Sequence, residues 1–167
     1  MAPDDRHLAR PPLNKFPGLY VRVGEDIRAA PEADQSVGRS YPNWRDKGPN
    51  IGGRRITILT ANVRARPNEE VRVVHVAEAT DASAMLYTMG PKPVLGEYVD
   101  GILTTPPAPE EDPLRPPGLY DGPVVPGPAV DYGYDITAYR FTEPGTHRIV
   151  WRLGDLESNE VLVAVEP

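Results

Sequence analysis

The chain has 167 residues, of which 40% are hydrophobic, and it carries a formal net charge of −6. This length fits one domain with a real core, or one domain with long arms. The absence of cysteine excludes disulfides, thiolate nucleophiles and thiolate metal sites. The 21 prolines and 15 glycines exceed ordinary usage and favour extended and turn-rich segments over helices.

Residues 1–54 form the first predicted unit, an extended N-terminal arm rich in proline, glycine and arginine. We expect a short strand at Leu19–Val23 and a short helix-like stretch at Pro31–Val37. An aromatic cluster follows at Tyr41–Trp44. The glycines of residues 48–53 then predict a tight turn or flexible joint into the body of the chain.

Residues 55–167 form the second predicted unit, a β-sandwich. Period-two patterns and turn residues predict strands at residues 55–66, 71–79, 84–89 and 94–103, with Asp81–Leu86 as a second short helix candidate. Residues 104–130 hold nine prolines and predict a long proline-rich loop, a type of segment that is often functional when ordered.

Three more strands are predicted between Tyr132 and Val165, where polar and apolar residues alternate between turns. Because alternate side chains of a strand share a face, two sets of residues should point into a core. These residues are His147, Ile149, Trp151 and Leu153 in one strand, and Val161, Val163 and Val165 in the last. The pattern is typical of a sheet packed against a second sheet.

The strand rhythm of residues 55–167, with Pro144-Gly145-Thr146 ahead of the penultimate strand, resembles the immunoglobulin-like or fibronectin type III-like sandwich. His147 departs from that pattern, which often has an aromatic residue there. The resemblance implies an all-β fold, a two-layer antiparallel immunoglobulin-like β-sandwich with an extended N-terminal arm and a long proline-rich loop. Such folds serve adhesion, scaffolding, inhibition and sugar binding, so the fold alone sets no function.

Sequence motifs for catalysis and cofactor binding are lacking. The four serines are not in a nucleophile elbow, and the glycines of residues 51–55 lack the spacing of a phosphate-binding loop. Two histidines, His75 and His147, lie in predicted strands and could approach one another, but their surroundings favour structural roles over metal binding. We therefore expect no catalytic residues, no metal and no cofactor.

Charge and targeting signals give three further expectations. Residues 1–72 carry thirteen basic against nine acidic side chains, and residues 73–167 carry five against fifteen, which suits docking of a basic arm on an acidic body. The acidic body disfavours nucleic-acid binding. No apolar stretch predicts a signal peptide or membrane insertion, so a cytoplasmic location is the default, with extracellular or virion assembly left open.

Aromatic and arginine side chains outside the predicted core are candidates for partner binding, because these residue types mark protein interfaces. They are Phe16, Tyr20, Tyr41, Trp44, Arg54, Arg55, Tyr98 and Tyr120. The alternative is that they fasten the arm and loops to the sandwich. The sequence thus predicts a non-enzymatic structural or interaction module in a larger assembly, bound to another protein or to copies of itself. A carbohydrate-binding module and a loop-presenting protease inhibitor are the alternatives.

Overall fold

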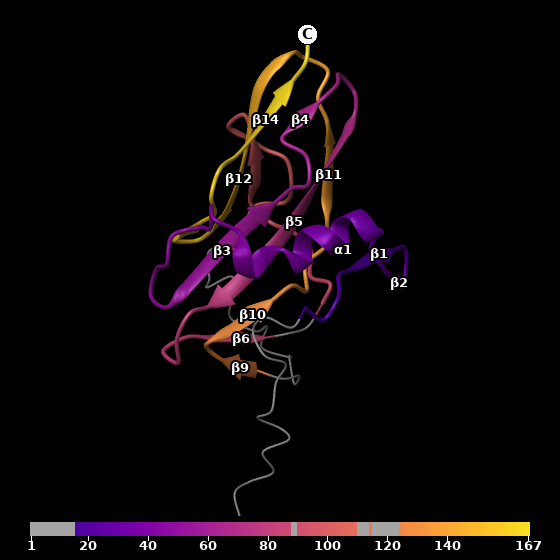
Figure 1. Cartoon of the computed structure of the whole chain (residues 1–167). Helices are drawn as coiled ribbons and strands as arrows, with labels where there is room; N and C mark the ends of the chain where they lie inside the picture. Colours follow the sequence, from indigo (N-terminus) through magenta and orange to yellow (C-terminus); the bar gives the residue numbers. More distant parts are fainter. Residues whose placement is uncertain (1–15, 88–89, 110–113, 115–123) are drawn as a thin grey trace, which may run out of the picture.

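The computed structural model describes residues 16–87, 90–109, 114 and 124–167. These residues form two β-sheets packed face to face, with an N-terminal layer across the outer face of the first sheet (Figure 1). The prediction of an all-β fold is confirmed. The described residues include a single α-helix, α1 (Glu32–Arg39).

The first sheet is built around β5 (Glu70–Ala79). One edge of β5 pairs antiparallel with β3 (Arg54–Leu59), so that Ile58 lies opposite His75. Its other edge pairs with β10 (Ala129–Asp131) and β11 (Thr137–Arg140), one after the other along the strand. Every residue of β5 therefore has a neighbouring strand.

The second sheet has the order β4-β14-β12-β7-β8. Its strands are β4 (Arg64–Ala65), β14 (Val161–Val165), β12 (Gly145–Leu153), β7 (Glu97–Val99) and β8 (Ile102–Leu103), with β13 (Leu156–Glu157) returning on β12. The pairs are antiparallel except that β14 runs parallel to β4. The C-terminal strand is thus enclosed on both edges.

The main core lies between the two sheets and contains most of the side chains predicted to point inward. Ile149, Trp151 and Leu153 are buried, as are the three valines of β14. His147 differs, because its side chain lies at the rim of the core and stacks on Phe141 with ring centroids 4.4 Å apart. The period-two pattern of β12 and β14 therefore predicted the core face correctly except at His147, near the start of β12.

A second core lies on the outer face of the first sheet. It consists of side chains from β3, β5 and the segment after β10 on one side, and from residues 16–44 on the other. Its buried members are Leu19, Ala30, Val37, Tyr41, Leu59, Val74, Val76 and Tyr132. Since β5 is covered on both faces, its sequence is a nearly continuous apolar run and not a simple alternation.

The N-terminal layer consists of the hairpin β1 (Tyr20–Val23) and β2 (Asp26–Ala29), followed by α1 and the 3-10 turn η2 (Tyr41–Asn43). Apolar burial holds this layer to the sheet. The Arg55–Glu78 ion pair joins the basic and acidic parts of the chain, but it lies between two strands of the sheet itself, β3 and β5. The Arg72–Asp34 pair does link the layer to the sheet, and there the layer supplies the acidic partner.

Four predicted elements differ in the structure. Residues 55–66 form two strands, β3 and β4, which belong to different sheets. Residues 94–103 form the β7–β8 hairpin, because Asp100 and Gly101 turn the chain with φ of 51° and 80°. Within residues 104–130, β9 (Val124–Pro126) pairs with β6 (Met85–Tyr87) and β10 begins at Ala129.

The fourth difference concerns a helix. The helix-like pattern at Pro31–Val37 corresponds to α1, but the helix candidate Asp81–Leu86 is wrong, since the chain there forms a turn and enters β6. The side chain and amide of Ser83 bond to Asp81 in that turn, which competes with helix formation.

Candidate interaction surfaces

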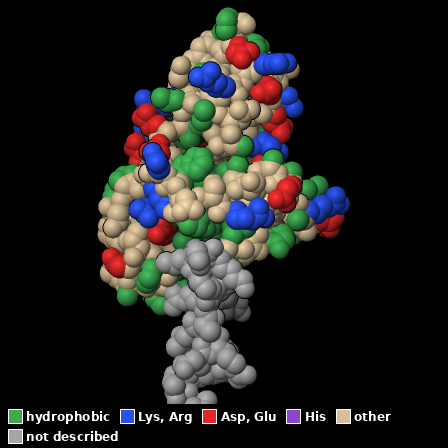
Figure 2. All heavy atoms as spheres, viewed as in Figure 1, with side chains coloured by type: hydrophobic (Ala, Val, Ile, Leu, Met, Phe, Trp, Pro, Cys, Tyr) green, Lys and Arg blue, Asp and Glu red, His purple; other side chains and the backbone are tan. Residues whose placement is uncertain are grey.

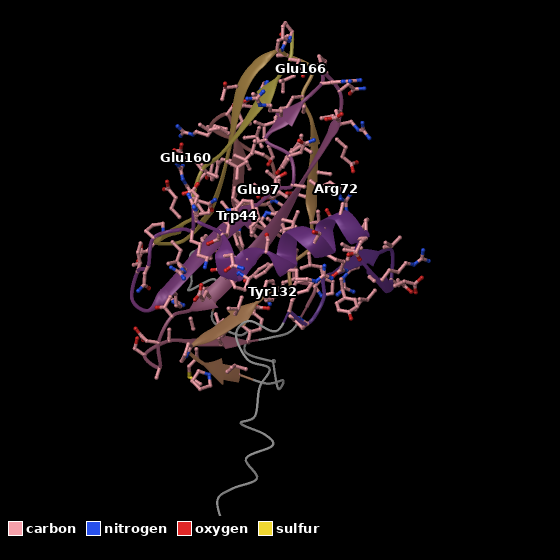
Figure 3. All side chains as sticks on the ribbon, in the orientation of Figure 1. Trp44, Arg72, Glu97, Tyr132, Glu160 and Glu166 are labelled. Atoms are coloured by element: carbon pink, nitrogen blue, oxygen red, sulfur yellow. The ribbon has the colours of Figure 1, made fainter. Side chains whose placement is uncertain are left out.

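Three of the predicted partner-binding aromatics lie in the second core. Tyr41 is buried, and Phe16 and Trp44 pack against the same cluster. Phe16 and Tyr41 each meet the Tyr132 ring edge-on, with centroids 5.0 and 6.0 Å apart. Figure 3 shows Trp44 and Tyr132 on the side of the sheet that α1 covers. These aromatics fasten the N-terminal layer to the sheet.

The predicted arginines lie at the start of β3, beside the same layer. Arg55 donates from Nε to Glu78 Oε1 at 2.8 Å, and the Tyr41 hydroxyl donates to the same oxygen. Burial and the neighbouring Glu78 together raise the pKa of Tyr41 well above its usual value. Arg54 is half-buried. The structure thus brings Tyr41 and Arg55 together as an internal anchor.

Tyr98 lies elsewhere, on β7 in the second sheet. Its side chain points to the outer face of that sheet, and the guanidinium of Arg152 lies over its ring at 5.1 Å. No helix in the described residues covers this face as α1 covers the first sheet. The prediction for Tyr120 lies outside the described residues.

Tyr20 is the most accessible of the predicted residues that the structure describes. It begins β1, and its side chain is half exposed. Two further large apolar side chains of the same hairpin, Val23 and Ile27, are 48% and 51% exposed. The hairpin extends beyond the sheets at the side of the molecule (Figure 1). Sequence reasoning missed Val23 and Ile27, although Gly24-Glu25 between two short β-prone runs is a hairpin signal.

Polar side chains of the types used in catalysis form buried clusters. Between the sheets, the Nε2 proton of His75 is donated to Glu97, which also accepts from Thr137 at 2.5 Å and from Tyr139. Both His75 and Glu97 have side chains with no exposed surface. A substrate therefore cannot reach them in this conformation, and the cluster is suited to holding the two sheets together.

The electrostatics of this cluster follow from its hydrogen bonds. Burial raises the pKa of Glu97, but the interactions with His75, Thr137 and Tyr139 outweigh burial and leave that pKa below its usual value. Burial, followed by the contact with Glu97, raises the pKa of Tyr139 above its usual value. Nδ1 of His75 has no hydrogen-bond partner among the described residues.

A second buried ion pair joins Lys92 to Asp131, with Nζ and Oδ2 2.6 Å apart. The Lys92 ammonium also lies over the Tyr134 ring at 4.5 Å, and burial lowers its pKa. Both charged side chains are only 5% exposed. Breaking such a pair leaves an uncompensated charge, so this pair fixes the segment before β7 against β10.

The two strand histidines do not form a joint site. His147 donates to Asp100 from Nδ1 at 2.6 Å and to the Glu143 carbonyl from Nε2 at 2.7 Å, whereas His75 bonds to Glu97. Across the described ranges, no group of three or more His, Asp or Glu side chains is placed to hold a metal ion. No helix within those ranges has the length and apolar character needed to span a membrane.

Comparisons with protein-family models, with curated proteins and with solved structures found no match to this chain. The surfaces described above are therefore interpreted from their own geometry. The β1–β2 hairpin combines exposed apolar side chains, the half-exposed aromatic Tyr20 among them, with an exposed strand edge. The edge strand β8 also exposes apolar side chains, with Ile102 69% and Leu103 37% exposed.

Proposed function

We propose that this protein is a non-enzymatic structural or protein-interaction module that works as a subunit of a larger assembly. The observation that carries the proposal is the β1–β2 hairpin, which exposes Tyr20, Val23 and Ile27 away from both cores. An isolated two-stranded hairpin is marginally stable in water, so a contact with another protein would stabilise it. Exposed aromatic and aliphatic side chains at such a place favour protein contacts.

The internal use of the other candidate residues supports binding over catalysis. Two close pairs of titratable groups, His75 with Glu97 and Lys92 with Asp131, are buried and hold strands together. A sugar-binding platform needs exposed aromatic faces, but Tyr41 is buried and Trp44 packs on the second core. Among the exposed apolar strands, we favour the β1–β2 hairpin as the functional element because it carries the half-exposed aromatic Tyr20.

We further propose that the sandwich is of the immunoglobulin-like type. Its strand pairing supports this, since β3, β5 and β11 share one sheet while β8, β7, β12 and β14 share the other. This matches the division between A-B-E and C′-C-F-G strands in that fold. The chain departs from antibody domains because it has no cysteine and because its buried tryptophan, Trp151, lies in the strand corresponding to F.

Site-specific photo-cross-linking tests the interaction role. A benzophenone amino acid is placed at Tyr20 in the full chain and, as the matched control, at Val63, which is equally exposed at 53% but lies just before β4. The two proteins are irradiated both purified and in extracts of the source cells. We expect a discrete cross-linked protein from position 20 and none from position 63.

The pattern of products decides the outcome. A Tyr20-specific product of any protein identity supports the interaction role. If position 20 gives no protein product in either setting, or gives the same products as position 63, the proposed function is wrong.

A further inference from the structure

Among the described residues, β2 pairs with β1 alone, so its outer edge is an open strand edge. The Ala30 amide donates to the Leu19 carbonyl at 2.9 Å, and the register pairs Val21 with Arg28 and Val23 with Asp26. Hydrogen-bonded pairs alternate in an antiparallel ladder. The N–H and C=O groups of Ile27 and Ala29 therefore point away from β1.

An independent contact on β1 supports this assignment. The amide of Arg22, the partner of Ile27 in the register, points outward and donates to Asp135 Oδ1 at 3.1 Å. The outer edge of β1 is thus held against the body. Within the part of the chain that the structure describes, the outer edge of β2 has no such contact, and all four residues of β2 are exposed.

The chain closes a comparable edge elsewhere. At the free edge of β3, the Asn159 side chain accepts from the Ile58 amide at 2.8 Å and donates to the Ile58 carbonyl at 2.9 Å. The Thr57 hydroxyl beside it accepts from the Gly48 amide. Natural sheets block exposed edges with charged side chains, prolines or bulges. The β2 edge, Asp26-Ile27-Arg28-Ala29, has no proline or bulge, and its two charges are of opposite sign, so they need not repel a second strand of the same sequence.

The sequence of this edge is complementary to itself. If two copies of β2 pair antiparallel with a two-fold axis at Ile27, the outward groups of Ile27 face those of Ile27 in the second copy. Asp26 of each copy then lies opposite Arg28 of the other, on the same sheet face. Opposite charges at facing positions stabilise a strand pair, whereas like charges destabilise it.

The side chains of Asp26 and Arg28 are exposed enough to leave their present contact and pair across the two-fold axis. Asp26 and Arg28 are 71% and 65% exposed and now contact each other within the strand at 3.4 Å, a weak interaction at the surface. On the opposite face, pairing would bring the two exposed Ile27 side chains together. Figure 2 shows charged side chains of both signs beside hydrophobic ones on the part of the molecule that projects to the side.

We propose, on the basis of the interaction role above, that the partner of the β1–β2 hairpin is a second copy of this chain. The two β2 edges join into a four-stranded sheet, β1-β2-β2-β1, around a two-fold axis at Ile27. Such an isologous contact closes on itself, so it produces a dimer.

Charge exchange across the axis tests both the partner and the register. The full chain and the variants Asp26→Arg, Arg28→Asp and the double exchange D26R/R28D are compared by sedimentation equilibrium and multi-angle light scattering. The wild type should shift with concentration from 18.3 kDa to twice that mass. Each single variant places like charges opposite each other twice and should weaken the dimer by about tenfold or more.

Two samples should recover the dimer. In the double exchange, each pair of facing charges is again of opposite sign. An equimolar mixture of D26R and R28D should form a heterodimer, because the two facing pairs are then positive with negative. Circular dichroism and melting of each monomer serve as the folding control, since both positions are exposed.

The results separate this proposal from the proposed function. A wild type that stays monomeric, or a dimer that the single exchanges do not weaken, overturns self-association through β2. If position 20 then cross-links a different protein, the interaction role stands with another partner. If position 20 cross-links nothing, both proposals fail.

Discussion

Trp151 shows how a single residue ties the two sheets together. It is completely buried, its indole N–H donates to the Leu95 carbonyl at 2.8 Å, and its ring meets His75 and Tyr134 edge-on with centroids 5.0 Å from each. Replacing a buried tryptophan with alanine removes this packing and leaves a cavity. We expect Trp151→Ala to lower the free energy of unfolding by about 3–5 kcal/mol in urea denaturation.

A matched surface variant controls for general effects of truncation. Leu162 lies on the neighbouring strand β14 and is 51% exposed, so Leu162→Ala should change the free energy of unfolding by less than about 0.5 kcal/mol. Equal unfolding midpoints for the wild type and Trp151→Ala would place Trp151 outside the core and contradict the packing described here.

His147 provides a residue-scale prediction of pH dependence. Both of its ring nitrogens donate, to Glu143 O and to Asp100 Oδ2, which requires the protonated imidazole. The Glu143 carbonyl and the Asp100 carboxylate raise the pKa of His147 above its usual 6.5. The contribution of these two contacts to the free energy of unfolding should be complete at pH values below the pKa of His147 in the unfolded chain. It should be lost as the pH rises through the higher pKa of His147 in the folded chain.

An NMR titration of the imidazole resonances measures this directly. The midpoint for His147 should exceed 6.5 in the wild type, and Asp100→Asn should move it toward that value. Asparagine suits this test because it tolerates the positive φ of 51° at position 100. A wild-type midpoint at or below 6.5 would show that the imidazole does not make both contacts.

At the scale of elements, the contact between α1 and the segment before β1 depends on a glycine. A Cβ atom at Gly38 would lie 2.8 Å from a Phe16 ring carbon and 3.0 Å from a Leu19 methyl. Gly38→Val should therefore push α1 away from its neighbours and cost about 1–3 kcal/mol in stability. Ser36→Val, at an exposed position of the same helix, should cost less than about 0.5 kcal/mol.

Chemical denaturation monitored by tryptophan fluorescence and by far-ultraviolet circular dichroism tests the pair. Limited proteolysis should also cleave the N-terminal layer of Gly38→Val sooner than that of Ser36→Val. Unfolding midpoints that are lowered equally by both variants would mean that α1 is not closely packed at Gly38.

The strands that could be predicted were those whose hydrophobic pattern follows from packing against one other layer. The alternation of β12 and β14 follows from a single buried face, and it identified Ile149, Trp151 and Val163 correctly. The split of residues 55–66 into β3 and β4 was not predictable, because apolar residues continue while the chain changes sheets. That change depends on pairing with β14, almost a hundred residues later.

The candidate site was harder to predict than the fold. Aromatic residues near Tyr41 could have been exposed or buried, and the outcome depends on whether α1 packs on β5. Only the first strand of the hairpin could be predicted from the sequence, since β1 has β-prone residues but β2 has Ile27 as its one large apolar side chain. No local pattern shows that the β2 edge is left unpaired.

The whole molecule has a strong gradient of burial, from β5 at the centre to the β1–β2 hairpin at the periphery. Amide exchange with solvent requires opening, and openings are easiest where few apolar contacts must break. In hydrogen exchange at dilutions that keep the chain monomeric, we expect the slowest amides in β5 and β12 and the fastest strand amides in β2. Protection of β2 equal to that of β5 under these conditions would contradict this ranking.

The position of Tyr132 in the second core has a consequence for synthesis on the ribosome. The ring edges that hold Phe16 and Tyr41 belong to a residue that is made more than ninety positions after Tyr41. The N-terminal layer leaves the ribosome first, yet its binding face on β5 is not complete until the chain beyond β10 has emerged. During that interval Phe16 and Tyr41 lack the Tyr132 ring and the second core is incomplete, so a nascent chain stalled before residue 132 should expose apolar surface that chaperones bind.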